Sequence, residues 1–241
     1  MCFFALIGIN IAMCPGIVQS NYGVTLVGGG ELNPASVTDS LTIAPCLVAA
    51  DGGADAVLAL GLTPQAVIGD MDSISHAALA ATEPGRIHRI TEQDTTDFEK
   101  CLMAIRAPFI LAAGFTGARM DHGLAAFHAL VRHPAQRCII LGTQDICFLA
   151  PALLVLDIPK ATRLSLFPMG AVSGRSTGLR WPINGLAFAP DRKIGTSNET
   201  TGPVRLSFDA AAMLVILPTQ CLPAAIAALL RDAPPPPARG K

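Results

Sequence analysis

Short apolar runs alternate with helical patterns along the first 145 residues of the chain. The apolar runs are expected to form strands at residues 23–27, 47–50, 66–68, 87–90, 109–112 and 138–141. Helical patterns lie between them, at residues 55–60, 75–81, 96–107 and 121–132. This alternation predicts a mostly parallel sheet with helices on both faces, in an α/β domain over residues 21–145.

The pattern changes after residue 145. Short β-type segments follow, separated by Gly, Pro, Ser and Asn, at residues 153–157, 163–167, 185–188, 204–208 and 212–217. A long helical pattern returns only at residues 222–230. We therefore expect a second, all-β domain over residues 146–219, a small sandwich or roll. A short helix and a Pro-rich tail over residues 220–241 would follow it.

The first 20 residues are apolar and contain neither Lys nor Arg. A secretory signal begins with basic residues, and the run is short for a membrane-spanning helix. Residues 1–20 are therefore expected to be a nonessential N-terminal extension, or the result of a start codon placed too early, rather than a secretory signal.

Composition narrows the classes of partner. The chain is 51% hydrophobic and 15% charged, with a formal net charge of −1. No basic surface for nucleic acid or for an anionic membrane is expected from this balance. The seven Cys are scattered and form no CxxC pair. This predicts buried free thiols in a reducing compartment, and hence a cytoplasmic location.

Aspartate-rich segments follow several of the predicted strands. ADGGAD ends at Asp55, IGDMDS contains Asp70 and Asp72, EQDTTDFEK contains Asp97, and GFTGARMDH contains Asp121. In open α/β sheets, ligands bind at the carboxyl ends of the strands, so these segments are expected to converge. Carboxylates among Gly, Ala and Ile are costly unless a cation compensates their charge. Clustered oxygen ligands of this kind indicate Mg²⁺ holding a polyphosphate.

The D-x-D pair of Asp70 and Asp72 follows the predicted strand at residues 66–68. In an extended chain, residues i and i+2 point the same way, so both carboxylates would face one metal ion. Gly69 would let the backbone approach a ligand closely. Because a D-x-D pair also occurs in turns, phosphatases and glycosyltransferases, the pair alone leaves those alternatives open.

The segment DTTDFEK opens the predicted helix at residues 96–107. Either Thr95 or Asp94 is expected to be its N-cap. Asp97 and Lys100 lie three residues apart, so they share one face of the helix. That face would present a carboxylate to a metal ion and an ammonium group to a phosphate.

Glycine-rich loops connect other predicted strands to helices, as in Asp51-Gly52-Gly53 and in GFTGARMDH. Arg119 in the second loop would pair with a phosphate through two parallel hydrogen bonds. His122 is a candidate base, although a His at the start of a helix is more often structural. Trp181, the single Trp of the chain, is by default a core residue of the β domain.

Taken together, these segments resemble the thiamine pyrophosphokinase family. The resemblance rests on ADGGAD, GDMDS, QDTTDFEKCL and GFTGARMDH in this order, and on STGLRWPI and GTSNE in the C-terminal part. It covers residues 22–218, and QDTTDFEKCL is its most specific segment. The chain departs from the family pattern where Met71 replaces Phe, Ala118 replaces a usual Gly and Ala126 stands where Asn is frequent.

The resemblance implies a Rossmann-like α/β domain with a mostly parallel sheet and a C-terminal all-β sandwich domain, assembled as a homodimer. The implied activity is that of a thiamine diphosphokinase. It transfers the pyrophosphoryl group of ATP to the hydroxyl of thiamine and leaves AMP. Thiamine would lie between the α/β domain of one subunit and the β domain of the other.

The resemblance also divides the site residues into three groups. Mg²⁺ and the catalytic step would depend on Asp70, Asp72 and Asp97. ATP would be held by Asp51, Gly52, Gly53, Gln93, Thr96, Lys100, Arg119, Asp121 and His122. Thiamine would be held by Thr177, Trp181, Ser197 and Asn198, with the indole stacked on its rings. The base for the thiamine hydroxyl would be a carboxylate of the first group or His122.

Two other functions use the same residues. A Mg²⁺-dependent phosphatase or nucleotide hydrolase would release inorganic phosphate without thiamine. A non-catalytic module that senses nucleotide or thiamine would bind its ligand and form no AMP.

Overall fold

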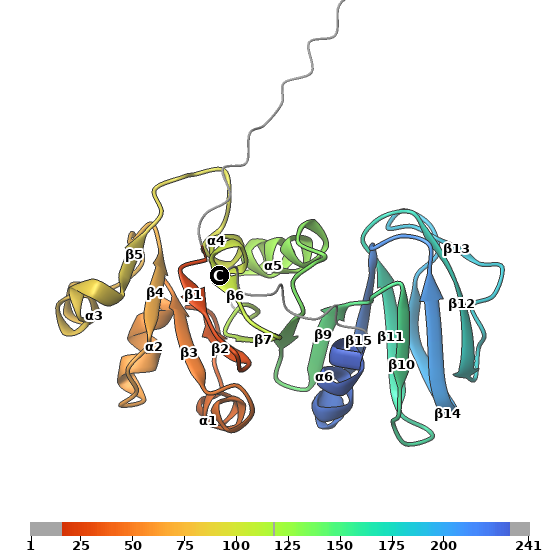
Figure 1. Ribbon diagram of the computed structural model, residues 1–241. Helices are drawn as coiled ribbons and strands as arrows, with labels where there is room; N and C mark the ends of the chain where they lie inside the picture. Colours follow the sequence, from red (N-terminus) through yellow and green to blue (C-terminus); the bar gives the residue numbers. More distant parts are fainter. Residues whose placement is uncertain (1–15, 118, 232–241) are drawn as a thin grey trace, which may run out of the picture.

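The computed structural model describes residues 16–117 and 119–231, in which one large sheet runs from end to end (Figure 1). The α-helices of these residues are α1 (Pro34–Ile43), α2 (Gly53–Ala59), α3 (His76–Ala81), α4 (Asp97–Ala104), α5 (Met120–Arg132) and α6 (Leu222–Arg231). The strands of the first half are β1 (Val18–Gln19), β2 (Val24–Val27), β3 (Cys46–Ala50), β4 (Ala66–Gly69), β5 (Ile87–Arg89), β6 (Ile105–Arg106), β7 (Ile110–Ala113) and β8 (Cys138–Leu141). Those of the second half are β9 (Asp145–Leu149), β10 (Leu153–Leu156), β11 (Arg163–Pro168), β12 (Val172–Leu179), β13 (Ala187–Phe188), β14 (Gly195–Phe208) and β15 (Met213–Pro218).

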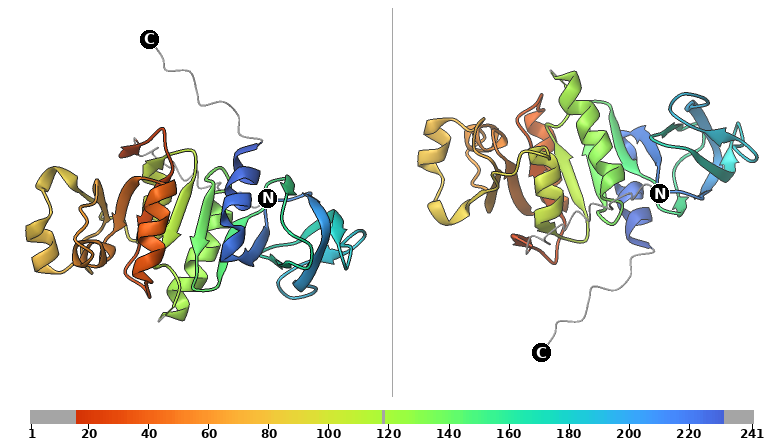
Figure 2. Two further views of the ribbon diagram at one scale, coloured as in Figure 1. Left: turned by 90° about the horizontal axis from the view of Figure 1, so that it is seen from below. Right: turned by 90° about the horizontal axis from the view of Figure 1, so that it is seen from above.

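The first half of the chain forms a parallel sheet in the order β5-β4-β3-β2-β7-β8. Helices α4 and α5 cover one face of it, and α1, α2 and α6 lie on the other (Figures 1 and 2). Neighbouring residues of one strand serve opposite faces, since Leu26 packs in the cluster with α4 and α5 while Val27 packs in the cluster with α1 and α2. The strand order reverses between β2 and β7, and such a switch point is where open α/β sheets bind ligands.

The second half continues the same sheet with antiparallel strands. β9 pairs with β8, and the order then runs β15-β11-β14-β12-β13. The 14-residue strand β14 pairs with β11 near its start and with β10 near its end. The apolar residues between these strands belong to the same buried cluster as α6. The molecule is therefore a mixed α/β structure in which a parallel and an antiparallel half share one sheet.

Several elements differ from the sequence expectations. Helix α1 was not expected, although Asn33 accepts a hydrogen bond from the Ala35 amide and Pro34 stands at the first helical position. Helix α4 ends at Ala104 rather than at residue 107 because the chain turns into β6, which pairs with β1. Strand β9, strand β12 and the first part of β14 were also not expected. The expected boundary between residues 145 and 146 falls inside β9.

The described part of the chain also allows a check of the expected free thiols and a search for membrane-spanning helices. Its cysteines are buried free thiols, as predicted, at positions 46, 101, 138, 147 and 221. Burial raises the pKa of Cys147 to about 12, so this thiol stays protonated at neutral pH. No helix in the described ranges is both long enough and apolar enough to cross a bilayer. Most of the expected N-terminal extension and of the Pro-rich tail lies outside the described residues.

Candidate active site

Three carboxylates meet at the carboxyl ends of the parallel strands. Asp51 follows β3, Asp70 follows β4, and Asp97 is the first residue of α4. One oxygen from each lies within 4.8 Å of the other two, and we call this group the acidic cluster. Three carboxylate oxygens at this spacing suit a hard divalent cation such as Mg²⁺. Sequence reasoning placed Asp70 and Asp97 in this role and gave Asp51 to ATP.

Asp51 is the buried member of the cluster, with 1% of its surface exposed. Its carboxylate accepts backbone hydrogen bonds from Ser73 (3.2 Å) and Ile74 (2.9 Å). Burial raises its pKa, and the negative charges of Asp97 and Asp70 add to the rise, while the two backbone hydrogen bonds oppose it. Its φ of 41° lies in the left-handed region, which a non-glycine residue rarely adopts. Asp51 thus fixes the loop that follows Asp70.

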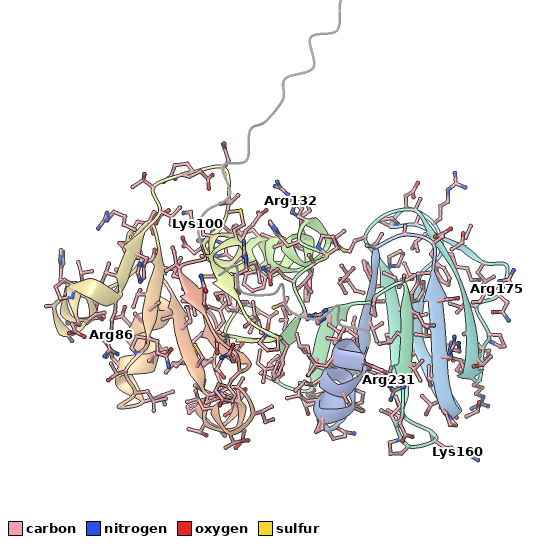
Figure 3. The ribbon with its side chains drawn as sticks, viewed as in Figure 1. Arg86, Lys100, Arg132, Lys160, Arg175 and Arg231 are labelled. Carbon is pink, nitrogen blue, oxygen red and sulfur yellow. The ribbon has the colours of Figure 1, made fainter. Side chains whose placement is uncertain are left out.

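Lys100 supplies a cation to the same cluster from α4 (Figure 3). Its Nζ donates to Asp70 Oδ2 at 2.8 Å and to Asp97 Oδ1 at 3.2 Å, and the side chain is 1% exposed. Burial alone would lower the pKa of Lys100, but the two hydrogen bonds outweigh it and the pKa is raised. The Lys100 hydrogen bond in turn lowers the pKa of Asp70. Three carboxylates and one ammonium leave the cluster with net negative charge for a further cation.

The carboxylate of Asp72 does not join this group. The expectation of an extended chain from Asp70 to Asp72 is wrong, because Met71 has a φ of 67° and is buried. The chain turns there, so the Asp72 side chain is exposed and accepts a hydrogen bond from the Ser73 hydroxyl at 2.7 Å. The Asp72 amide faces Asp70 Oδ1 at 3.4 Å. The metal-binding role of Asp72 stays a prediction, and Asp51 stands closer to Asp70 and Asp97.

Close packing around Gly69 brings the carboxylates together. A Cβ on Gly69 would lie 2.8 Å from Asp51 Cβ and 3.0 Å from Asp97 Oδ1, both too close for an ordinary contact. Gly53 is packed more tightly still, since a Cβ there would lie 2.1 Å from the Val27 carbonyl oxygen. These glycines allow the start of α2 and the end of β4 to approach neighbouring backbone.

Helix α4 begins one residue later than expected. Its N-cap is Thr96, whose hydroxyl accepts from the Glu99 amide at 3.3 Å, rather than Thr95 or Asp94. Gln93 is exposed in the preceding loop, with its Nε2 at 3.4 Å from the Thr91 carbonyl. Thr96 and Gln93 therefore lie at or just before the N-terminus of α4, next to Asp97 of the acidic cluster.

Glu99 is a buried residue whose contacts sequence reasoning missed. Its carboxylate lies 2.8 Å from His133 Nε2 and 3.3 Å from Arg132 Nε, at the C-terminal end of α5. The sequence contained a signal for this contact. Glu99 lies two residues after Asp97 in a predicted helix, so its side chain is expected on the opposite side of α4 from the acidic cluster. This contact ties α4 to α5 and so holds the helix that carries Asp97 and Lys100.

Arg119 and Asp121 form an exposed pair before and within the first turn of α5. The guanidinium donates from Nη2 to Asp121 Oδ2 at 2.6 Å and from Nε to Asp121 Oδ1 at 3.2 Å. The Arg119 hydrogen bond lowers the pKa of Asp121 to about 2. His122 beside them is exposed. Arg119 precedes α5 in the loop after β7, and Asp121 and His122 lie in the first turn of α5. Strand β7 stands two strands from β3 in the sheet.

The expected thiamine residues lie in the antiparallel half. Trp181 is 55% exposed, so the default expectation of a core Trp is wrong. Its ring faces the Arg180 guanidinium at 5.0 Å and borders a cavity of about 360 Å³ that Leu186, Phe188 and Lys193 also line. A half-exposed indole beside an apolar cavity is suited to stacking on a flat ring.

Asn198 borders the same cavity and is buried. Its Oδ1 accepts from the Trp181 amide at 3.2 Å, and its Nδ2 donates to the Trp181 carbonyl at 2.7 Å. Asn198 therefore positions Trp181. Ser197 is exposed with a φ of 60° and donates its amide hydrogen to Ser165 Oγ at 2.9 Å. Thr177 is exposed on β12, opposite Arg205 of β14.

Comparison with known protein families matches two parts of the chain. Residues 38–141 match the family described as "Thiamin pyrophosphokinase, catalytic domain", and residues 155–213 match "Thiamin pyrophosphokinase, vitamin B1 binding domain". The first match contains the acidic cluster, and the second contains Trp181.

Individual relatives agree with these matches. Thiamine pyrophosphokinase 1 of Arabidopsis thaliana is 31% identical over 156 residues, which cover 56% of this chain and 58% of that protein. The chain therefore matches little more than half the length of this curated relative. A solved protein of Lactobacillus plantarum has a TM-score of 0.70 at 26% identity, covering 82% of this chain and 98% of the other. Thiamin pyrophosphokinase of Candida albicans shares the fold, with a TM-score of 0.68 at 16% identity over 83% and 91% of the two chains.

Proposed function

The chain belongs to the thiamine pyrophosphokinase family, and from this premise we propose that it transfers the pyrophosphoryl group of ATP to the hydroxyl of thiamine. The products are thiamine diphosphate and AMP. The observation that carries the proposal is the acidic cluster with Lys100, gathered from β3, β4 and α4 at the carboxyl ends of the parallel strands. The protein would be a thiamine diphosphokinase.

The chemistry follows from the charge of the site. The thiamine oxygen forms a bond to the β-phosphorus of ATP while the bond from that phosphorus to the bridging oxygen of AMP breaks. The hydroxyl proton passes to a base, and the leaving oxygen remains on AMP. Transfer of this kind depends on positioning and on neutralising phosphate charge. Mg²⁺ held by Asp51, Asp70 and Asp97 would supply that neutralisation, and Lys100 stands beside it.

We assign ATP to the α/β half of the chain. Arg119 has a planar guanidinium that suits two-pronged phosphate binding, and its hydrogen bond to Asp121 orients it. Gln93 lies in the loop before α4, Thr96 is the N-cap of α4, and His122 lies in the first turn of α5. The loop glycines Gly52 and Gly53 place backbone amides at the start of α2, beside Asp51. Asp72 remains a proposed further ligand of the metal.

We assign thiamine to the cavity beside Trp181. Thiamine carries a cationic ring, and an exposed indole attracts such a ring electrostatically. Asn198 positions the indole, while Thr177 and Ser197 are proposed to supply hydrogen bonds near it. Lys193 on the rim would meet the diphosphate of the product.

The separation of the acidic cluster from the Trp181 cavity supports a site built from two subunits. Asn198 lies on β14, and β14 and β3 stand seven strands apart in the sheet order, which is roughly 34 Å at about 4.8 Å per strand. Figure 1 shows β12 and β13 at the opposite end of the sheet from β3 and β4. One thiamine molecule cannot span that distance. We therefore propose a homodimer in which a Rossmann-like half of one subunit faces the β-sandwich half of its partner.

The domain limits belong to the same proposal. Residues 21–145 would form the catalytic domain and residues 146–219 the thiamine-binding domain, joined through β8 and β9. The buried free thiols of the described residues suit a reducing compartment, so we propose a cytoplasmic location.

Product analysis tests the proposed activity. The purified protein is incubated with ATP, Mg²⁺ and thiamine, and AMP, ADP, phosphate and thiamine diphosphate are resolved by chromatography. We expect AMP and thiamine diphosphate in equal amounts, and neither without thiamine. Phosphate release without thiamine would indicate a hydrolase instead. Binding of ATP or thiamine without any AMP would indicate a sensing module.

A further inference from the structure

Arg180 lies over one face of the Trp181 ring, outside the cavity that the ring borders. The central carbon of its guanidinium is 5.0 Å from the centre of the ring. Trp181 lines the cavity of about 360 Å³, whereas Arg180 does not. An indole ring has two faces, so the guanidinium covers the face that is turned away from the cavity.

Glu199 of β14 holds Arg180 in this place. Its Oε2 lies 3.6 Å from Arg180 Nη1, and its carbonyl accepts a hydrogen bond from the Arg180 amide at 2.8 Å. The two side chains are 57% and 38% exposed, so the ion pair contributes little to the stability of the fold. It does compensate the charge of the guanidinium, which would otherwise stand uncompensated behind a ring that is proposed to attract a cation.

The preceding residue of β14 holds the backbone of Trp181. Asn198 accepts from the Trp181 amide and donates to the Trp181 carbonyl, and Pro182 restricts the backbone of the residue before it. These contacts fix the main chain, whereas the ring can still turn about its side-chain bonds. Consecutive residues of β14 therefore hold consecutive residues of the segment after β12, and Arg180 limits the rotation of the ring.

Arg180 has two opposite effects on the binding of a cationic ring to the other face. A cation on the covered face draws on the same electron density, and an exposed contact of this kind contributes about 0.5–1 kcal/mol. Ordering a freely rotating side chain on binding costs about 0.5–1.5 kcal/mol. Because Glu199 compensates the charge of Arg180, the first effect is reduced. The saved cost of ordering is then the larger effect, so Arg180 favours binding.

We propose that Arg180, held by Glu199, is a positioning residue of the Trp181 cavity. It keeps the indole ring turned toward the cavity and covers the other face, so a planar cationic ligand stacks on one face only. The inference rests on the proposed function for the identity of this ligand, thiamine. The orientation of the ring can be measured without any ligand.

Time-resolved fluorescence anisotropy of the full chain reports on the ring directly, because Trp181 is the single Trp. In the wild type the decay should follow the tumbling of the whole molecule. Arg180→Ala should add a faster component, since exposed side chains rotate within nanoseconds. Acrylamide should also quench this variant more strongly, because the second face of the ring becomes accessible. Arg180→Lys keeps a cation and should restore part of the difference.

Steady-state kinetics of thiamine diphosphate formation separate positioning from chemistry. Arg180→Ala should raise the KM for thiamine about fivefold, which is about 1 kcal/mol. Its kcat should stay close to that of the wild type, because the ring contacts the ligand equally in the ground state and the transition state. Glu199→Gln should show the same changes in part. The double variant should be no weaker than Arg180→Ala, since both changes act through one contact.

Arg175→Ala is the matched control, because Arg175 is an exposed Arg of β12 that does not line the cavity (Figure 3). It should leave the anisotropy and the KM unchanged. A ring as immobile in Arg180→Ala as in the wild type, or an unchanged KM for thiamine, would overturn the inference. If circular dichroism shows that Arg180→Ala does not fold, Glu199→Gln decides by the same two measurements. If no variant and no wild-type protein forms thiamine diphosphate, the proposed function fails, and the anisotropy alone decides the inference.

Discussion

Lys100 and the carboxylates around it depend on one another. A buried ammonium is costly alone, and so are Asp70 and Asp97 at such short separation, yet together they satisfy each other's charge. Removing one partner of a buried pair leaves the other uncompensated, which costs about 3–5 kcal/mol. Lys100 therefore holds the Asp70 and Asp97 carboxylates close together.

Lys100→Met should make the protein more sensitive to acid. The Lys100 hydrogen bond lowers the pKa of Asp70 from its ordinary value of 3.8. An Asp whose pKa is lowered on folding stabilises the fold above its unfolded pKa, and this stability is lost as the pH falls through its folded pKa. Without Lys100 the folded pKa rises, so acid unfolding should begin at a higher pH.

Circular dichroism from pH 7 to pH 2, in buffer containing a chelator, measures the change. Lys160→Met is the control, since Lys160 is exposed and lies far from Lys100 in Figure 3. An acid midpoint in Lys100→Met equal to that of the wild type would contradict the assigned ion pairs.

Gly69→Ala should impair the reaction more than the fold. The added methyl group would lie 2.8 Å from Asp51 Cβ and 3.0 Å from Asp97 Oδ1, so it pushes these carboxylates apart. Misplacing catalytic groups by about 1 Å reduces turnover about a hundredfold. Rates of AMP formation measure the effect, with Gly85→Ala as control because nothing lies within 4 Å of a Cβ there. Equal rates in the two variants would show that the spacing around Gly69 is unimportant.

At the scale of elements, helix α4 presents the site. Thr96 caps its N-terminus, Asp97 and Lys100 face the cluster, and Glu99 on the other side contacts α5. The first turn of this eight-residue helix therefore both contributes side chains to the acidic cluster and packs against α5. Its start decides where the Asp97 carboxylate lies.

Thr96→Ala should destabilise the protein by about 1 kcal/mol, because the Glu99 amide loses its acceptor. Thr96→Ser keeps a hydroxyl and should restore most of the stability. Urea unfolding followed by circular dichroism measures both variants. A Thr96→Ala variant as stable as the wild type would mean that the cap is made by another residue.

The strands that sequence reasoning predicted are those with the clearest physical signal. β3, β4, β7 and β8 are buried on both faces and read as continuous apolar runs. β12 was missed because its sequence, VSGRSTGL, has glycine and polar residues where alternation would be expected. α1 was missed although Asn33 and Pro34 mark its start, since its sequence carries only a weak apolar stripe.

For the candidate site too, some features were predictable from the sequence and others were not. Convergence of Asp51, Asp70 and Asp97 followed from the rule that ligands bind at strand ends. The exclusion of Asp72 from the cluster did not, because the left-handed turn at Met71 depends on burial of that side chain in the tertiary structure. The positioning role of Asn198 likewise depends on the tertiary structure. Asn198 and Trp181 are 17 residues apart in the sequence, and they meet only because β14 lies beside the segment that contains Trp181.

At the scale of the whole molecule, the long sheet keeps the acidic cluster and the Trp181 cavity apart. The parallel half contains the acidic cluster, and the antiparallel half contains the apolar cavity beside Trp181. If both contribute to one reaction, a second copy of the chain must bring its cavity to the cluster. A two-fold dimer would then contain two equivalent composite sites.

Mixing two inactive variants should restore activity. In heterodimers of Asp70→Asn and Trp181→Ala, one site receives both changes and the other receives neither. Random assortment makes half the dimers mixed, so about a quarter of the sites should be intact. Thiamine diphosphate formation after joint refolding, compared with each variant refolded alone, measures this. Activity no higher than the sum of the separate variants would indicate that each chain completes its own site.

The central claim is that carboxylates from separate strand ends bind the cation that holds the triphosphate. A crystal of the protein with Mn²⁺ and a non-hydrolysable ATP analogue, measured at the Mn²⁺ absorption edge, tests it most directly. We predict an anomalous peak within about 2.2 Å of carboxylate oxygens of Asp70 and Asp97 and adjacent to the analogue's phosphates. A bound analogue whose Mn²⁺ lies away from these two carboxylates would contradict it.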